Sequence, residues 1–217
     1  MADIRQSTGI FDDFNRDENP LSHSGDWAQI DTTRDPLQAL LIAPGFGTAR
    51  RTGSGSAYSY WTPLVMDGDD AECWSYTRGG NASANAWGWA LLRGLGGTNA
   101  WDGYVARMEI GTGGGSCHMY RVLNGTSTNI QTNNANPPTG GGWLGLIRRN
   151  GALVEFWASD DGQTGANWTN YLSVSDSTYT TGLSGALHCF GDLTEHDYFG
   201  VGPHVVRRPQ FFRLIRN

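Results

Sequence analysis

The sequence predicts an all-β protein, a two-sheet antiparallel β-sandwich, and three observations carry that prediction. Short apolar and aromatic runs recur along the chain, separated by clusters of Gly, Asn and Asp, which is typical of strands joined by turns. Helical periodicity is almost absent. Glycine is abundant, with 31 residues dispersed between these runs, so it marks turns. A chain of 217 residues suits one such domain, over residues 1–217.

The expected strands follow one another through the whole chain. Residues 10–14 open the domain, and residues 27–30 follow a Ser/Gly turn. Residues 36–42 are short and end before Pro44-Gly45, so they form a strand over 39–42 or one helical turn. The other expected strands cover residues 57–62, 71–77, 87–93, 104–110, 117–123, 128–131, 143–149, 153–159, 169–173, 186–190 and 211–215. The last of these is expected to pair beside the N-terminal strand and close the domain.

The firmest turn prediction is at Asn150-Gly151, between the strands at 143–149 and 153–159. Asn-Gly favours a type I′ hairpin, because that turn needs positive φ at both central residues. Longer loops rich in Gly, Asn and Thr are expected over 79–85 and 124–142, and ordered loops of this kind often carry function.

Two segments bear a family resemblance. One is Ile10-Phe11-Asp12-Asp13-Phe14-Asn15-Arg16 with Pro20-Leu21 and Trp27; the other runs from Leu146-Ile147-Arg148-Arg149-Asn150-Gly151 through Glu155-Phe156-Trp157-Ala158-Ser159-Asp160-Asp161-Gly162 to Asn167-Trp168. They resemble the opening strands and the late hairpin of concanavalin A-like lectin/glucanase jelly-roll domains. That resemblance implies a sandwich that holds carbohydrate or another protein. The lysine-free, signal-free chain also looks like a bacteriophage virion protein, a minor tail or head-decoration component.

Composition excludes several classes of function. The net charge is −6, which argues against nucleic acid as a partner, because phosphate binding needs a basic surface. All fifteen basic residues are Arg, so lysine chemistry is excluded. No apolar run is long enough to insert into a membrane, and the absence of a signal peptide predicts synthesis in the cytoplasm. Cys73, Cys117 and Cys189 lack metal-ligand spacing and are expected to be buried thiols.

Catalysis is predicted to be absent. Glycosidases of this fold place two carboxylates on one sheet face. Only five Glu are present, and the two in predicted strands, Glu109 and Glu155, have no acidic residue two positions away. A pair assembled from different strands stays open as an alternative. Gly53-Ser54-Gly55-Ser56 lacks the strand–turn–helix context of a nucleophile elbow.

Two acidic loops are candidate cation sites. Asp67, Asp69 and Asp70 surround a glycine, and Asp160-Asp161-Gly162 forms a second such loop. Carboxylate and carbonyl oxygens of this kind could hold Ca²⁺. The simpler interpretation is that these Asp residues form turns at strand ends. No other cofactor is expected.

Aromatic residues supply the candidate ligand site. Trp87 and Trp89 alternate and so share one face, which we assign to the core. Trp101 lies in a Gly-bounded segment with Asn99, Asp102 and Tyr104, and is the better candidate for an exposed contact with a sugar or a protein. The alternative is that Trp101 plugs one end of the sandwich.

These inferences together predict a non-enzymatic binding module. The leading hypothesis is a phage virion protein at the tail or head surface that contacts other virion proteins, host-surface glycan or both, and that could form a homo-oligomer in the particle. A free-standing carbohydrate-binding module or lectin is the second hypothesis. A glycoside hydrolase or lyase of the same fold is the third.

Overall fold

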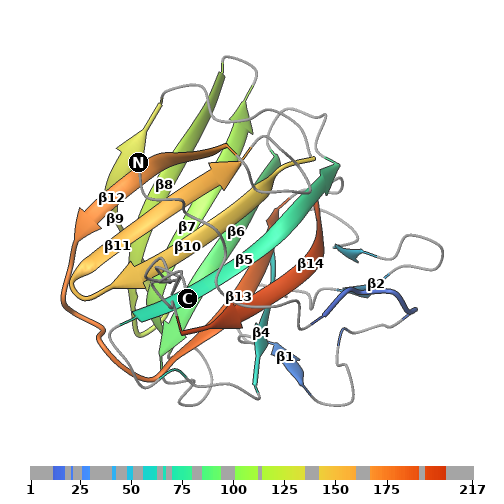
Figure 1. The fold of residues 1–217 in the computed structure, drawn as a ribbon, viewed down its shortest axis with the longest axis horizontal. Coiled ribbons are helices and arrows are strands. Elements are labelled where there is room, and N and C mark those ends of the chain that lie inside the picture. Colours follow the sequence, from blue (N-terminus) through green and yellow to red (C-terminus); the bar gives the residue numbers. More distant parts are fainter. Residues whose placement is uncertain are drawn as a thin grey trace, which may run out of the picture.

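The computed structural model describes residues 12–17, 21, 26–29, 41–42, 48–50, 56–62, 66, 70–79, 85–93, 101–111, 114–134, 142–159, 167–190 and 194–203. Within these ranges the chain forms two seven-stranded antiparallel sheets that lie one in front of the other (Figure 1). The predicted all-β, two-sheet sandwich is confirmed. The described part of the chain contains no helix long and apolar enough to cross a membrane.

The two sheets are built from fourteen strands. Sheet I has the order β1-β4-β13-β6-β7-β8-β9, and sheet II has the order β12-β11-β10-β5-β14-β3-β2. The strands are β1 (Trp27–Gln29), β2 (Leu41–Ile42), β3 (Ala49–Arg50), β4 (Ser56–Trp61), β5 (Asp70–Gly79), β6 (Asn85–Arg93), β7 (Asp102–Gly111), β8 (Gly114–Leu123), β9 (Thr126–Asn133), β10 (Leu144–Asn150), β11 (Leu153–Ser159), β12 (Trp168–Ser175), β13 (Leu183–Phe190) and β14 (Thr194–Gly202).

The core lies between the sheets and takes every second residue of each long strand, as the pleat requires. Trp87 and Trp89 of β6 are fully buried there, which confirms their assignment to the core. The indole of Trp89 packs over Gly145 of β10 so closely that a Cβ on that glycine would lie 2.2 Å from the ring. The three cysteines are free and buried, as expected.

The N-terminal motif is organised by one carboxylate and is not a strand. Asp12 makes only an isolated bridge to Phe199 of β14, and Phe14 has a φ of 51°. The Asp12 carboxylate accepts hydrogen bonds from Trp27 Nε1 at 2.7 Å, from the Phe14 amide at 2.8 Å, and from both terminal nitrogens of Arg16. These local bonds compete with a β-ladder, so the predicted strand at 10–14 is wrong in its described part.

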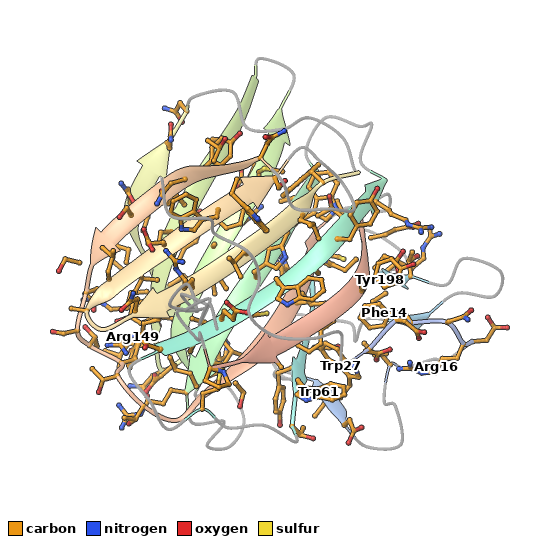
Figure 2. The ribbon with its side chains drawn as sticks, in the orientation of Figure 1. Phe14, Arg16, Trp27, Trp61, Arg149 and Tyr198 are labelled. Carbon is orange, nitrogen blue, oxygen red and sulfur yellow. The ribbon has the colours of Figure 1, made fainter. Side chains whose placement is uncertain are left out.

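This cluster closes one end of the core. Trp27 contacts Phe199, Trp61 and Phe14, with ring centroids 4.6, 5.4 and 5.9 Å apart. Figure 2 shows Phe14, Trp27 and Trp61 gathered at one end of the sandwich and Arg149 toward the other end. The sequence motif of the resemblance is therefore a structural anchor.

Two hairpins that contain an Asn-Gly pair differ in the type of their turns. Gly151 has a φ of 59°, as expected, but Asn150 pairs with Leu153 and remains in β10. The two-residue turn is thus Gly151-Ala152 with positive φ at its first residue only, the type II′ pattern, and the type I′ prediction is wrong. The type I′ pattern occurs instead at Asn124-Gly125, where φ is 49° and 71°. That turn joins β8 to β9, and β9 occupies much of the predicted 124–142 loop.

Strand β14 was not predicted from the sequence. It pairs with β5 in the middle of sheet II, but its register shifts between Asp197 and Phe199. Tyr198, between them, has a φ of 50° and is exposed. This bulge breaks the alternation of apolar and polar residues that identifies a strand. The predicted strand at 211–215 lies outside the described residues, as do residues 36–40.

Hydrogen bonds connect the edge strand of sheet I, β9, to the edge strand of sheet II, β12. Gln131 of β9 accepts a hydrogen bond from the Ser173 amide, and Asn133 Nδ2 donates one to the Tyr171 carbonyl, both at 2.7 Å. Side chains of one edge thus satisfy backbone groups of the other. This arrangement blunts an edge that would otherwise offer a template for strand addition.

Candidate functional site

The outer face of sheet I carries a group of half-exposed polar and aromatic side chains over strands β7, β8 and β9. The ladder sets their positions: His118 lies opposite Arg107 and Thr132, and Tyr120 lies opposite Asn129. We call this surface the polar platform and define it by Arg107, Glu109, Ser116, His118, Tyr120, Asn129 and Thr132. The intervening residues of β7 and β8, such as Met108 and Met119, face the core.

Hydrogen bonds fix the imidazole of His118 at the centre of the polar platform. Its Nε2 lies 2.8 Å from Ser116 Oγ, and its Nδ1 lies 3.1 Å from Thr132 Oγ1. Asn129 Nδ2 donates to Thr132 Oγ1 at 3.0 Å. Since both ring nitrogens have a hydroxyl partner, the ring is held in one orientation, which lowers the entropic cost of binding a ligand.

An ion pair borders this imidazole. Arg107 Nε lies 3.1 Å from Glu109 Oε1, and both side chains are partly open, at 26% and 35% exposure. Glu109 also lies 3.9 Å from His118 Nε2. Burial raises the pKa of the neighbouring Tyr120, so its phenol stays protonated at neutral pH and can donate a hydrogen bond. The platform therefore presents donors and acceptors without a strong excess of either charge.

Two rings form the flat part of the platform. His118 and Tyr120 are two residues apart on β8 and so share a face, with ring centroids 5.9 Å apart and planes inclined by 32°. Tyr120, together with Tyr60 of β4, packs against a cluster of buried apolar side chains that includes Val105 and Ala186. A rigid aromatic surface ringed by hydroxyl, amide and charged groups is the arrangement that sugar sites use.

The predicted ligand site around Trp101 lies at one end of this same face. Trp101 is 9% exposed and belongs to the apolar cluster against which Tyr120 packs. Its carbonyl accepts a hydrogen bond from the Gly125 amide at 2.9 Å, and the Asp102 carboxylate accepts one from the Asn124 amide at 2.7 Å. These contacts pin the segment to the β8–β9 turn. Asn99 lies outside the described residues, and binding through Trp101 stays a prediction.

Tyr104, the fourth predicted ligand residue, points the opposite way, into the core. Its hydroxyl donates to Asp176 Oδ1 at 2.8 Å and accepts from the Tyr179 amide at 3.2 Å. Burial raises the pKa of Tyr104 to about 12. Burial acts in the same direction on Asp176, but hydrogen bonds from Thr178 and Tyr104 outweigh it and lower the pKa of that carboxyl. This network ties the segment after β12 to sheet I.

The predicted cation loops are only partly described. Asp67 and Asp69 lie outside the described residues, and so does Asp160-Asp161-Gly162. Asp70 begins β5 and is half-buried. Among the residues that the structure describes, no group of three or more His, Cys, Asp or Glu side chains could hold a metal ion. A calcium site at Asp67, Asp69 and Asp70 stays a prediction.

The two glutamates expected in strands lie on opposite outer faces of the sandwich. Glu109 belongs to the polar platform, whereas Glu155 projects from the outer face of sheet II, beside Trp157. With both sheets between them, they cannot act on one glycosidic bond. The ladder does bring Glu72 and Glu155 to one face, which the sequence spacing concealed. However, both are buried, and Arg148 stands between them and bonds Glu155.

One buried dyad has the elements of a nucleophile and a base. Ser75 Oγ lies 2.7 Å from His196 Nδ1, and His196 Nε2 lies 2.9 Å from the His188 carbonyl. Because a carbonyl only accepts, Nε2 carries the proton, and Nδ1 accepts from the Ser75 hydroxyl. Both residues have 0% exposure in the core, so no substrate reaches them. The network, which Trp89 Nε1 completes, joins the two sheets.

Comparison with known proteins identifies the fold by structure alone. No family model and no curated protein matches the sequence. The carbohydrate recognition domain of Emp46p, in a potassium-bound form, superposes with a TM-score of 0.63 at 10% identity over 91% of this chain and 97% of that one. The exoplasmic/lumenal domain of VIP36, in a Ca²⁺- and mannose-bound form, gives 0.58 at 12% identity, covering 90% and 92%.

Two bacterial structures extend this comparison. The carbohydrate-binding module CBM66 from Bacillus subtilis gives a TM-score of 0.51 at 14% identity and covers 80% of this chain and 91% of that one. The GH43 protein BlXynB from Bacillus licheniformis gives 0.59 at 12% identity, but the match covers only 39% of it. At these identities the likeness establishes a lectin-like β-sandwich and nothing finer, which agrees with the predicted concanavalin A-like fold.

Proposed function

We propose that this protein is a non-catalytic glycan-binding module whose binding site is the polar platform. The observation that carries the proposal is the pair of adjacent rings, His118 and Tyr120, held on the outer face of a sheet. Apolar faces of pyranose rings pack on such surfaces, while equatorial hydroxyls exchange hydrogen bonds with the groups around them. Asn129, Thr132 and the Arg107–Glu109 pair supply those groups.

The fold supports this proposal independently of the site. Structures described as carbohydrate recognition or carbohydrate-binding domains share it over most of this chain. The sugars that those proteins bind are not assigned to this protein, because fold alone does not specify a ligand. The chemistry of the polar platform favours a neutral glycan, since its one guanidinium is already paired with a carboxylate.

A glycan array, run with and without Ca²⁺, tests the proposal. Wild type is expected to bind a limited set of glycans, and Tyr120→Ala and His118→Ala are expected to lose them. Tyr198→Ala is the matched control, because Tyr198 is an exposed aromatic residue of sheet II. Loss of binding in the control as well, or binding that persists in both platform variants, would contradict the proposal.

Absence of catalysis is part of the same proposal. Incubation with laminarin, chitin, arabinogalactan and peptidoglycan is expected to release neither reducing ends nor unsaturated sugars. Its support is geometric: the platform carboxylate, Glu109, has no second described carboxylate beside it on that face. Turnover that Glu109→Gln or Glu155→Gln abolishes would instead establish an enzyme.

The setting we propose is the surface of a phage particle, where a glycan-binding module would hold the host. This part rests on sequence style, arginine without lysine, and is independent of the platform. Mass spectrometry of purified particles tests it: the protein present at stoichiometric level supports the virion role. A protein found only in the cell lysate contradicts that role and leaves glycan binding to be judged separately.

A further inference from the structure

Two Asn-Gly pairs lie at hairpin turns of this protein, and they differ in how firmly their backbone is held. Asn124-Gly125 joins β8 to β9 in sheet I, and Asn150-Gly151 lies where β10 turns into β11 in sheet II. Both asparagines are exposed. An asparagine followed by glycine can react with its own backbone, so each turn is a candidate for a spontaneous modification.

The reaction joins the asparagine side chain to the next peptide nitrogen. The glycine amide loses its proton to a base in solution, and its nitrogen attacks Cγ of the asparagine. The bond from Cγ to Nδ2 breaks, and that nitrogen takes a proton from solvent and leaves as ammonia. Water then opens the five-membered succinimide at either carbonyl, giving aspartate or isoaspartate. One water is consumed, one ammonia is released, and no electrons are transferred.

This chemistry sets two structural requirements. The glycine N–H must be open to a base in solution and not held in a hydrogen bond, and the backbone must be able to rotate so that the nitrogen meets Cγ. Glycine itself helps, because it has no Cβ to crowd the attacking nitrogen. The local hydrogen bonds of each turn therefore decide whether it reacts in the folded protein.

The turn at Asn124-Gly125 is held at both residues. The Asn124 amide donates to Asp102 Oδ1 at 2.7 Å, and the Gly125 amide, which would be the attacking nitrogen, donates to the Trp101 carbonyl at 2.9 Å. The φ angles of 49° and 71° place both residues in a tight left-handed turn. The reaction here has to break the Gly125 hydrogen bond first, which suppresses it in the folded state.

The turn at Asn150-Gly151 is held less firmly. The ladder between β10 and β11 ends at the pair Asn150–Leu153, so the Gly151 N–H takes no part in it. A Cβ built on Gly151 would meet no atom within 4 Å, and Leu153 beyond the turn is 37% exposed, so water and base reach the site. Asn150 is also the last residue of β10, and strand ends open more readily than strand centres.

We infer that Asn150-Gly151 is a modification site at which the folded protein deamidates, whereas Asn124-Gly125 is protected by its hydrogen bonds. The inference concerns sheet II and does not depend on what the polar platform binds.

The product alters sheet II at a defined place. Asn150 lies opposite Asp70, the first residue of β5, so the two side chains share a face. Aspartate at residue 150 puts a second carboxylate opposite Asp70, and like charges across a ladder destabilise it. Isoaspartate adds a carbon to the backbone, which disturbs the register at this end of β10. A modified chain therefore carries one more negative charge and a weaker start to the β5–β10 ladder.

Peptide mapping of the aged full-length protein tests the site. The protein is incubated at mildly alkaline pH, and aspartate and isoaspartate at both turns are quantified by mass spectrometry over time. Asn150 should deamidate at least about tenfold faster than Asn124, because the protected turn must first break one or two hydrogen bonds. Asn124-Gly125 is the matched internal control, since it offers the same reaction in the same molecule.

Two further measurements separate structure from sequence. In concentrated urea the hydrogen bonds to Asp102 and Trp101 are lost, so the two turns should react at rates within about threefold of each other. In folded Asp102→Ala, the rate at Asn124 should rise while the rate at Asn150 stays unchanged. Equal rates at the two turns of the folded wild type, a faster reaction at Asn124, or an Asn150 that reacts only in urea would overturn the inference.

Discussion

Both outer faces of this sandwich carry a row of charged and aromatic side chains, but the two rows differ in how far they are exposed. On sheet I, alternate residues of β7 and β8 place Arg107, Glu109, His118 and Tyr120 at a half-exposed surface. On sheet II, alternate residues of β10 and β11 place Arg148, Glu155 and Trp157 under cover. Both faces mix charged and aromatic side chains. Alternation therefore identifies which residues leave the core, but it does not say which face is open to a ligand.

Ion-pair deletion gives the largest expected difference between the faces. Arg148→Met should lower the free energy of unfolding by about 3–5 kcal/mol, because it leaves the buried Glu155 carboxylate without its guanidinium. Arg107→Met, its counterpart on the polar platform, should cost less than about 1 kcal/mol, because solvent screens that partly exposed pair. Urea denaturation followed by tryptophan fluorescence measures both.

The double variants show whether the charges themselves are responsible. Arg148→Met with Glu155→Gln should recover part of the loss, since the isolated buried charge is gone. Equal costs for Arg148→Met and Arg107→Met would mean that the two faces are equally solvated, which would remove the basis of the comparison.

Acid should destabilise the contact between the two sheets at His196. Burial lowers the pKa of His196 from 6.5 to about 4, because the neutral ring is bonded inside the core between Ser75 and the His188 carbonyl. Between pH 6.5 and about pH 4, the unfolded chain binds a proton at this histidine and the folded chain does not. Stability from this group is therefore complete above pH 6.5 and is lost as the pH falls toward 4, by about 3 kcal/mol in total.

The variant His196→Gln isolates this contribution from that of the carboxylates. Its unfolding free energy, measured by denaturant titration from pH 7.5 to pH 4, should fall less steeply than that of wild type over the interval between the two pKa values. Identical slopes for the two proteins would show that His196 is not buried in the neutral form.

The smallest expected effects compare one turn from each sheet. Asn124 has a left-handed φ of 49°, so Asn124→Val should destabilise by about 1–2 kcal/mol. Asn150 also precedes a glycine but ends a strand, so Asn150→Val should change stability by no more than about 0.5 kcal/mol. Gly151→Val, with φ of 59° at the original residue, should cost more than about 1 kcal/mol. Thermal melting of the three variants ranks them, and a reversed order for the two asparagines would contradict the turn assignment.

Most of the fold could be predicted from the sequence because strands with regular alternation carry their own signal. The hairpin β10–β11 follows from the Asn150-Gly151 turn signal between two apolar runs. Strand β14 could not be predicted, because its bulge at Tyr198 interrupts the alternation. The opening segment looked like a strand, but the Asp12 carboxylate binds the backbone and Trp27 in place of a ladder, a contact between residues 15 positions apart.

The candidate site was harder to predict, because exposure is a tertiary property. Trp101 and Tyr104 looked equivalent in the sequence, yet one lies on the outer face of sheet I and the other in the core. The polar platform left a weak signal in Ser116-x-His118-x-Tyr120, a polar alternation on β8. Its other half comes from β7 and β9, so strand pairing was needed to assemble it. The virion role stays a prediction, since it concerns the particle and not the fold.

The central claim, that the polar platform is a glycan site, is tested most directly by calorimetric titration with the best ligand from the array. Wild type, Tyr120→Ala and Tyr198→Ala are titrated below the melting temperature of all three, so that affinity is compared per folded molecule. Tyr120→Ala should bind at least about tenfold more weakly, the loss of about 1.4 kcal/mol that an aromatic contact supplies, and Tyr198→Ala should bind like wild type. Equal affinities for all three proteins would contradict the account and place the binding site elsewhere on the molecule.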